Sequence, residues 1–448
     1  MKKILTIAGS DSSGGAGIQA DLKIIALMGE YGMSAVTALT AQNTKGVAEV
    51  FPIPPDFIVR QMYVVKEDIG VDGVKTGMLY SYEIINKIAE LLSIWKIKNL
   101  VIDPVMIAQS GDSLLDFKGQ KEIKNKLFPL ARIVTPNLKE ASILTGKKVE
   151  TVKDMEKAAK EILSFGSSSV LIKGGHLKDV DEIVDLFYDG KELFYFKSPK
   201  IKTLNTHGTG CTLSTAITVF LVQKNSIYDS VKKGREIIQS AIKNSVNLGK
   251  GEGPVNPYSY FAESIEKSKI IEQLKGAFEK LRYSKIGILI PEVQSNLGFA
   301  LHNAETKNDV AAFPGRIIRI NNQVDTLRDP VWGTSKHIAE IILTVMEFNP
   351  VYRSAMNIKY SEEIIKICNN LGFKVSRFDR ALEPKVVKEK EGATLNWGLK
   401  LILHKEKKVP DMIYDLGDIG KEPMIRVIGK DPFDVADKIL KIVNKLKI

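Results

Sequence analysis

Residues 3–29 read KILTIAGSDSSGGAGIQADLKIIALMG and contain the unit from which the first part of the chain is built. The run KILTIA is short and apolar, as a buried strand is. The run GIQADLKIIALMG has apolar residues three and four positions apart, which predicts an amphipathic helix. Between them, residues 9–17 form a glycine-rich loop that matches neither a Walker motif nor a dinucleotide-binding fingerprint. The stretch therefore predicts a strand, a glycine loop and a helix in succession.

The same alternation continues to about residue 248. Further buried strands are predicted at MSAVTAL, GVKTGM, NLVIDPV, RIVTPN and SVLIKGG, with helices at PDFIVRQMYVVKEDI, YEIINKIAELLSIW and VKDMEKAAKEILSFG. Strands that alternate with helices pair in parallel, so we expect an α/β fold with a mostly parallel sheet flanked by helices. Residues 181–199 predict instead an antiparallel hairpin with its turn at Asp189 and Gly190.

A second domain is predicted after the glycine- and proline-rich run GKGEGPVNPYSY, which begins at Gly249. A helix is expected at residues 265–281, followed by a loop-rich stretch at 291–333. The remaining elements are helices at 335–348, 361–372 and 431–446, and strands at 374–379, 396–404 and 423–429. We therefore expect a larger domain at residues 1–258 and a smaller, unrelated α/β domain at residues 263–448.

Composition and charge limit the classes of function. The formal net charge of the 448 residues is +11, but the lysines are scattered along amphipathic helices. This pattern favours solvated helix faces and some attraction for phosphorylated small molecules over a nucleic-acid interface. The two cysteines, Cys211 and Cys368, predict no disulfide, which fits a reducing cytoplasm. The N-terminal apolar run is too short for a signal peptide and no stretch approaches a membrane span, so no membrane partner is expected.

Polar residues follow successive predicted strands of the first domain. Asp103 follows one strand, Asn137 and Glu140 the next, and Lys173 the one after. Each has a structural alternative, since Asn137 and Glu140 could cap a helix and Asp103 could only end a strand. Together they lie where parallel sheets bind ligands, and they supply the carboxylates and the lysine that magnesium–phosphate chemistry requires. The set predicts a site for ATP and Mg²⁺.

The run NTHGTGCTLS at residues 205–214 precedes a helical pattern. Gly208, Thr209 and Gly210 would let the backbone approach an anion at the helix N-terminus, where free N–H groups and the helix dipole favour negative charge. The same field would lower the pKa of Cys211, which makes this thiol a candidate base. The alternative is a tight turn followed by a small residue packed in the first helical turn.

The motifs of the first domain occur in a characteristic order: GSDSSGGAGIQADLK, TALTAQNT, KTGML, DPVM, TPNLKEA, KGGH and NTHGTGCTLS. Residues 1–258 thereby resemble the hydroxymethylpyrimidine and phosphomethylpyrimidine kinases of thiamine biosynthesis, in the ribokinase-like superfamily. The resemblance implies two ATP-dependent phosphorylations of 4-amino-5-hydroxymethyl-2-methylpyrimidine. The roles it implies are pyrimidine binding by Asp21, Gln42 and Met78, magnesium binding by Asp103 and Glu140, phosphate binding by Asn137, Lys173, Gly208, Thr209 and Gly210, and action on the acceptor hydroxyl by Cys211.

Two further expectations accompany this resemblance. The nearest alternative is a pyridoxal kinase of the same superfamily, although Cys211, where many relatives have aspartate, favours the pyrimidine kinase. We also expect a homo-oligomer, most simply a dimer formed through the kinase domain.

The second domain has a separate resemblance. The runs IPEVQSNLGFAL, DVAAFPGRI, SKHIAEIIL, RSAMNI and DLGDIGKEPMIRVIG are similar to those of the archaeal-type thiamine-phosphate synthase domain, over residues 263–448. This resemblance implies coupling of the pyrimidine diphosphate to a thiazole phosphate with release of pyrophosphate, and it implies catalytic roles for Arg316 and His337. The alternatives are a surface salt bridge for Arg316, a surface or core position for His337, and a ligand-sensing or purely structural role for the whole domain.

Overall fold

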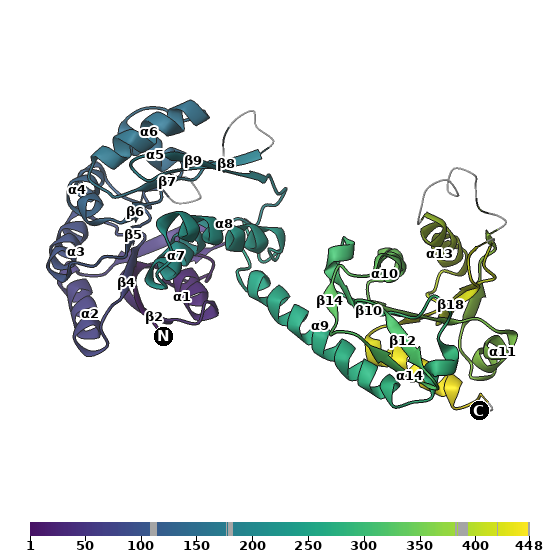
Figure 1. Ribbon diagram of the computed structural model, residues 1–448. Helices are drawn as coiled ribbons and strands as arrows, with labels where there is room; N and C mark the ends of the chain where they lie inside the picture. The colour runs from purple at the N-terminus through teal and green to yellow at the C-terminus, as the bar shows by residue number, and fades with distance from the viewer. Residues whose placement is uncertain are drawn as a thin grey trace. The chain divides into compact units, whose positions relative to one another are not determined.

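The computed structural model describes residues 1–107, 114–175, 177, 182–380, 383, 393–418 and 420–446. The chain forms two compact units, Met1–Phe261 and Ala262–Ile448 (Figure 1). Helix α9, Tyr258–Arg282, includes the residues at which the two units meet in the sequence. No helix among the described residues is long and apolar enough to cross a membrane.

The first unit is built on a nine-stranded sheet with the order β3-β2-β1-β4-β5-β6-β7-β8-β9. The six consecutive strands β2, β1, β4, β5, β6 and β7 pair in parallel. β3 at one edge, and β8 and β9 at the other, are antiparallel to their neighbours. The bounds are β1 Lys3–Asp11, β2 Tyr31–Asn43, β3 Gly46–Pro52, β4 Gly73–Thr76, β5 Leu100–Ile102, β6 Ile133–Val134, β7 Val170–Ile172, β8 Glu182–Tyr188 and β9 Leu193–Pro199. The predicted mostly parallel sheet is confirmed, and the predicted hairpin is β8–β9.

Helices cover both faces of this sheet (Figure 1). Consecutive strand residues point to opposite layers: Ile102 packs with α2, α3, α5 and α6, whereas Val101 packs with α7 and α8. Burial on both faces explains why these strands read as continuous apolar runs. The helices are α1 Gly17–Leu27, α2 Pro55–Asp68, α3 Tyr82–Trp95, α4 Phe117–Glu122, α5 Leu138–Thr145, α6 Val152–Ser164, α7 Thr209–Val222 and α8 Ile227–Lys243.

The second unit has a seven-stranded sheet with the order β14-β11-β10-β15-β18-β17-β16, in which only β16 and β17 pair in parallel. The strands are β10 Leu297–Ala300, β11 Val310–Ala312, β14 Val331–Trp332, β15 Ser354–Lys359, β16 Val375–Arg377, β17 Met412–Asp415 and β18 Met424–Gly429, with a separate hairpin of β12 Ile317–Ile320 and β13 Gln323–Thr326. One face packs against α9, α11 Glu362–Asn370 and α14 Pro432–Val443, and the other against α10 Lys336–Phe348 and α13 Ala393–Glu406.

One prediction for this unit is wrong and another is incomplete. Residues 396–404, predicted as a strand, belong to helix α13. Their leucines alternate, as in a strand, but Leu399, Ile402 and Leu403 are buried at helical spacing while Leu401 is 45% exposed. The stretch at 291–333 is loop-rich, as predicted, but it also contains the short strands β10 to β14, which the sequence analysis did not identify. Each of these strands has only two to four residues, too few to produce a recognisable alternation.

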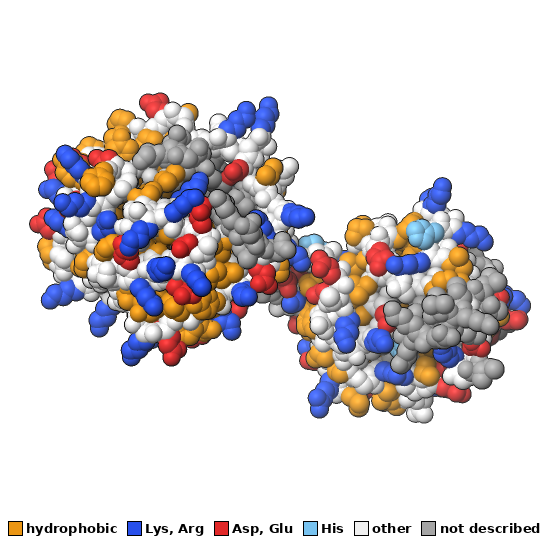
Figure 2. Space-filling model, turned by 90° about the horizontal axis from the view of Figure 1, so that it is seen from above, with side chains coloured by type: hydrophobic (Ala, Val, Ile, Leu, Met, Phe, Trp, Pro, Cys, Tyr) orange, Lys and Arg blue, Asp and Glu red, His pale blue; other side chains and the backbone are white. Residues whose placement is uncertain are grey.

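The surface agrees with the expectation of scattered charge. Figure 2 shows Lys and Arg side chains interspersed with acidic and apolar ones over the visible face of each unit.

Candidate active site

The glycine loop after β1 packs directly against the start of α7. Gly208, the N-cap of α7, has a φ of +82°, and a Cβ at this position would lie 1.8 Å from the carbonyl oxygen of Gly15. Only glycine permits both this conformation and this approach. The N-cap makes no side-chain hydrogen bond to the first helical turn, as in an anion site, although the Thr209 N–H donates to the Thr206 carbonyl at 3.2 Å.

An ion pair lies beside this helix start. Lys173 Nζ is 2.9 Å from Asp103 Oδ1, and a Cβ on Gly210 would lie 3.2 Å from Lys173 Nζ. Asp103 is 2% exposed and also accepts a hydrogen bond from Ser214 Oγ in α7. Burial opposes its charge, but Lys173 and Lys75 hold the pKa of Asp103 below its usual range. The structure thus brings together the lysine, the aspartate and the glycine that the sequence singled out.

Asn137 and Glu140 form a capping box at the start of α5. The Asn137 N–H donates to Glu140 Oε2 at 2.8 Å, and the Glu140 N–H donates to Asn137 Oδ1 at 2.9 Å. Glu140 is 3% exposed, and burial raises its pKa to about 7; the charge of Lys173 lowers the pKa and that of Asp103 raises it. The structural role proposed as an alternative is therefore present, and the same carboxylate is electrostatically coupled to the Lys173–Asp103 pair.

These two carboxylates fit Mg²⁺ only as part of a larger ligand set. Among the described residues, no group of three or more His, Cys, Asp or Glu side chains is arranged to hold a metal. Mg²⁺ in phosphate-transfer sites is commonly held by one or two carboxylates and completes its shell with water and substrate phosphates. Asp103 and Glu140 meet that requirement when a nucleotide supplies the remaining oxygens.

The expectation of an acidic thiol at Cys211 is wrong. Burial raises its pKa to about 11; Lys75 acts in the opposite direction, but Asp21 and Asp103 raise the pKa further. Loss of water and the two carboxylates therefore outweigh the field of the helix N-terminus.

Asp21, which is expected to hold the pyrimidine, lies in a buried hydrogen-bond network. Its carboxylate is fully buried and accepts hydrogen bonds from Thr6 at 2.5 Å, Thr215 at 2.7 Å and Lys75 Nζ at 2.9 Å. Burial opposes the charge of Lys75, but Asp21 keeps the pKa of Lys75 above its usual range. These bonds make Asp21 an internal link between α1, β1, β4 and α7, and its role in holding the pyrimidine stays a prediction.

Gln42 and Met78, the other residues expected to bind the pyrimidine, both lie at the glycine loop. The Ser12 hydroxyl donates to the Gln42 carbonyl at 2.8 Å, and the Met78 sulfur lies 3.4 Å from where a Cβ of Gly9 would be. Both side chains are partly exposed, as binding residues must be.

Sequence reasoning assigned no role to His207 or Asp11. His207 Nε2 lies 2.9 Å from Asp11 Oδ2 and 3.4 Å from Gln42 Nε2. Asp11 also accepts from the N–H groups of Ser13, Gly15 and Ala16. Burial by itself would raise the pKa of Asp11, yet the hydrogen bonds from His207, Ser13 and Ala16 hold this pKa well below its usual range. The pair joins the glycine loop to the start of α7, and the position of His207 within NTHGTGC was the available clue.

In the second unit, Arg316 and His337 lie on different elements. Arg316 precedes β12, has a φ of +71°, and donates from its guanidinium to the carbonyl of Val293. His337 is in the first turn of α10; its side chain is 70% exposed, and Nδ1 is 4.0 Å from Glu340 Oε2. Both are accessible, as residues that meet a substrate must be.

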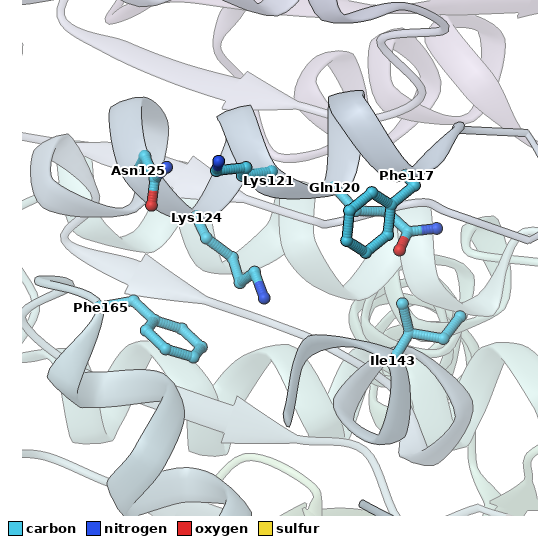
Figure 3. A pocket seen from close by; sticks show the side chains of 7 residues that line it. All are labelled: Phe117, Gln120, Lys121, Lys124, Asn125, Ile143 and Phe165. Atoms are coloured by element: carbon cyan, nitrogen blue, oxygen red, sulfur yellow. The ribbon is translucent and has the colours of Figure 1, made fainter. Parts of the chain in front are cut away.

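A groove of about 340 Å³ lies elsewhere in the first unit (Figure 3). Lys124 projects into it, with Nζ 5.2 Å from the centre of the Phe165 ring and 3.2 Å from the Leu144 carbonyl oxygen. None of the predicted site residues lines this groove. Its lining residues are Phe117, Gln120, Lys121, Lys124, Asn125, Ile143 and Phe165.

Comparison with known proteins gives two family matches. The phosphomethylpyrimidine kinase family matches residues 11–256, and the family described as thiamine-phosphate synthase ThiN matches residues 273–441. The thiamine biosynthesis bifunctional protein ThiED of Geobacter sulfurreducens is 47% identical over 253 residues, which are 56% of this chain and 51% of that protein. The hydroxymethylpyrimidine/phosphomethylpyrimidine kinase of Bacillus subtilis is 40% identical over 267 residues, which are 60% of this chain and 98% of that protein.

The chain thus spans about half the length of the bifunctional relative and nearly all of the kinase. Among solved structures, a Bacillus subtilis pyridoxal kinase in an ADP complex is 41% identical with a TM-score of 0.55, covering 58% of this chain and 99% of that one. A Staphylococcus aureus pyridoxal kinase in complex with AMP-PCP and pyridoxal is 37% identical with a TM-score of 0.54, covering 58% and 95%.

Proposed function

Because the chain belongs to the phosphomethylpyrimidine kinase family, we propose that residues 1–258 use ATP to phosphorylate 4-amino-5-hydroxymethyl-2-methylpyrimidine and then its monophosphate. The observation that carries the proposal is the contact of the Lys173–Asp103 pair with the uncapped start of α7. ATP as the donor is supported by the similar kinases described in complex with ADP and AMP-PCP.

Each group then has a role in phosphoryl transfer. Lys173 and the N–H groups at residues 208–210 would neutralise charge that develops on the transferring phosphoryl group. Asn137, whose side chain caps α5, is a weaker candidate for the same purpose. Asp103 and Glu140 would hold Mg²⁺, which supplies further neutralisation of the nucleotide phosphates. Gln42 and Met78 would contact the pyrimidine, and Cys211 would take the proton of its hydroxyl.

A pyridoxal kinase is the second candidate, because the similar solved structures bear that name and one contains pyridoxal. Cys211 favours the pyrimidine substrate. The test is to give the purified protein Mg-ATP with the hydroxymethylpyrimidine, its monophosphate or pyridoxal at equal concentrations. We expect the first two to be phosphorylated faster; preferential phosphorylation of pyridoxal would reject the proposal.

For residues 263–448 we propose thiamine-phosphate synthesis, supported by the family match at 273–441. The bond between the pyrimidine methylene carbon and the diphosphate oxygen breaks, a bond to the thiazole nitrogen forms, and pyrophosphate leaves. The aminopyrimidine can stabilise positive charge on the methylene, but the leaving diphosphate needs cations. Arg316 is the proposed cation and His337 a proposed second polar contact.

The synthase test supplies the pyrimidine diphosphate and thiazole phosphate with Mg²⁺ and measures thiamine phosphate. Arg316→Ala and His337→Ala should abolish coupling and leave both kinase steps intact. Unchanged coupling in both variants would reject the assignment, and a loss confined to Arg316→Ala would return His337 to a structural role.

We also propose a cytoplasmic homodimer that associates through the kinase domain. Four large apolar side chains on β3 and α2 are more than half exposed, a concentration that favours contact with a second copy. They are Phe51, Phe57, Tyr63 and Val64. Sedimentation of the intact chain and of Phe57→Ser tests this, since the substitution should shift the protein towards monomer.

A further inference from the structure

Arg316 occupies a backbone conformation that its side chain does not favour. Its φ is +71°, and the preceding Gly315 has a φ of +77°. Two consecutive left-handed residues are strained when one of them carries a Cβ, and such strain persists only where the surroundings fix it. The residues that fix this turn therefore determine where the guanidinium lies.

The side chain of Asn296 holds the residue that begins this turn, Phe313. Asn296 Nδ2 donates to the Phe313 carbonyl at 2.9 Å, and the Phe313 N–H donates to Asn296 Oδ1 at 3.0 Å. Asn296 is 7% exposed, so these bonds are protected from water. The Arg316 N–H donates back to the Phe313 carbonyl at 3.3 Å. The side-chain amide of Asn296 thus fixes both backbone polar groups of Phe313, the residue at which the turn to Arg316 starts.

The segment that contains Asn296 also holds the other end of the turn. The Ser295 and Ile317 backbones exchange two hydrogen bonds, of 3.2 and 2.8 Å, and the Arg316 guanidinium donates to the Val293 carbonyl. Residues 293–296 therefore contact the backbone on both sides of Arg316 and its side chain.

Asn357 anchors this segment to the centre of the sheet. Its Oδ1 accepts from the Asn296 N–H at 2.8 Å, and its Nδ2 donates to the Gln294 carbonyl at 3.0 Å. Asn357 lies in β15, which pairs with both β10 and β18, and is 9% exposed. The chain of bonds runs from a central strand through Asn296 to the turn.

We propose that Asn296 is a positioning residue that holds the turn at 313–317 so that Arg316 meets the diphosphate of the substrate. The inference rests on the proposed synthase function of residues 263–448. Asn296 touches no reacting atom; it acts through Arg316, and its loss displaces the guanidinium rather than removing it.

The experiment is a double-mutant cycle in the full chain with Asn296→Ala, Arg316→Ala and the double variant. Ser354→Ala is the matched control, because Ser354 is 1% exposed and its hydroxyl donates to the Gly298 carbonyl in the same sheet without reaching the turn. Coupling is measured with preformed pyrimidine diphosphate, and chemical unfolding of the second unit shows whether each variant is folded.

We expect Asn296→Ala to lower kcat by about ten- to a hundredfold, as small displacements of a binding group do, with little change in KM. Because Arg316→Ala abolishes coupling, the cycle itself is read from the affinity for magnesium pyrophosphate, measured by calorimetric titration. The double variant should bind it no more weakly than Arg316→Ala alone, and Ser354→Ala should keep nearly full coupling activity. Losses of affinity that multiply in the double variant, or an equal loss of coupling in Ser354→Ala, would overturn the proposal.

Two further arms keep every result informative. If Asn296→Ala fails to fold, Asn296→Asp replaces it; this variant keeps the oxygen that accepts from the Phe313 N–H but sets its second oxygen against the Phe313 carbonyl. Its loss of pyrophosphate affinity should likewise be absent from an Arg316→Ala background. If the native chain couples no substrate, the synthase proposal fails, and calorimetric titration with magnesium pyrophosphate decides. Equal, non-additive losses of affinity in the Asn296 and Arg316 variants would support positioning, and independent losses would reject it.

Discussion

At the scale of single residues, the role proposed for Cys211 predicts how the first phosphorylation depends on pH. Its pKa of about 11 means that the thiolate is scarce at neutral pH and increases about tenfold with each pH unit. If this thiolate deprotonates the acceptor alcohol, the rate of the first step should rise steeply from pH 7 to 9. The monophosphate is already ionised, so the second step should not show this rise.

The comparison variant is Cys211→Ala. It should remove the steep rise and slow the first step by roughly a hundred- to ten-thousandfold, with much less effect on the second. Steady-state rates with the alcohol and the monophosphate, measured across this pH range, provide the test. An unchanged slope in the variant would assign the proton transfer to another group.

Glu140 should make the first unit less stable as pH rises. Its pKa increases from 4.5 to about 7 on folding, so the folded state holds the proton more tightly and the free energy of unfolding falls between these two pH values. The free energy of unfolding should fall by on the order of 3 kcal/mol in total between the two pH values. Glu140→Gln removes the charge and can still cap α5.

Scanning calorimetry at pH 4.5 and pH 8 tests this, with loss of kinase activity identifying the transition of the first unit. Glu140→Gln should melt higher than the native chain at pH 8 and at about the same temperature at pH 4.5. Equal melting at both pH values would mean that Glu140 is charged and well solvated. The variant should also bind Mg²⁺ more weakly at pH 8.

Arg316 should lower the stability of the second unit through its positive φ while its guanidinium serves coupling. Replacement by glycine removes the strain of a positive φ, whereas alanine keeps it; both lose the guanidinium. We expect Arg316→Gly to be more stable than Arg316→Ala by about 1 kcal/mol, with no coupling in either. Chemical unfolding of the second unit compares them, and a less stable glycine variant would contradict the account of the turn.

The residues found from sequence and those missed differ in a physical way. Lys173, Asp103 and Gly210 each follow a strand or begin a helix, and parallel strands bring such positions to one edge of the sheet. His207 and Asn296 act through contacts with segments distant in sequence, Asp11 and Phe313, which no spacing rule relates to them. Burial explains the wrong direction expected for the pKa of Cys211, because one sequence does not show how much water a strand end retains.

At the scale of elements, the start of α7 depends on its close approach to the glycine loop. Gly208→Ala would place a methyl group 1.8 Å from the Gly15 carbonyl oxygen and so displace the helix start. We expect both kinase steps to be lost and coupling from preformed diphosphate to be retained. Gly29→Ala is the matched control, since Gly29 has nearly the same φ, +79°, with no atom within 4 Å of the added Cβ.

Kinase and coupling assays on the two alanine variants separate the effect of the clash from that of the backbone conformation. Equal kinase losses in both would mean that the positive φ alone causes the effect.

The prediction of elements from the sequence succeeded where elements were long and periodic, as in α6 and α14. It failed for β10 to β14, whose residues are too few to establish a period, and for α13, whose alternating leucines imitate a strand.

At the scale of the whole molecule, each unit has its own apolar core, and the two cores share no residue. We therefore expect residues 1–258 and 263–448, produced separately and mixed, to make thiamine phosphate from the hydroxymethylpyrimidine at close to the rate of the intact chain. The rates of each half alone are the controls. A large loss of overall flux with both halves fully active would show that the units depend on their covalent connection.

The strand order of the second sheet has a consequence for biosynthesis. β18, Met424–Gly429, is the last strand of the described chain, yet it lies between β15 and β17 in the interior of the sheet. The first unit has all its strands by Pro199, well before that point. A ribosome therefore releases a kinase unit able to fold while the synthase sheet still lacks an interior strand. Chains that terminate after residue 261, where the first unit ends, but before residue 424 should therefore keep the proposed kinase steps and accumulate the pyrimidine diphosphate.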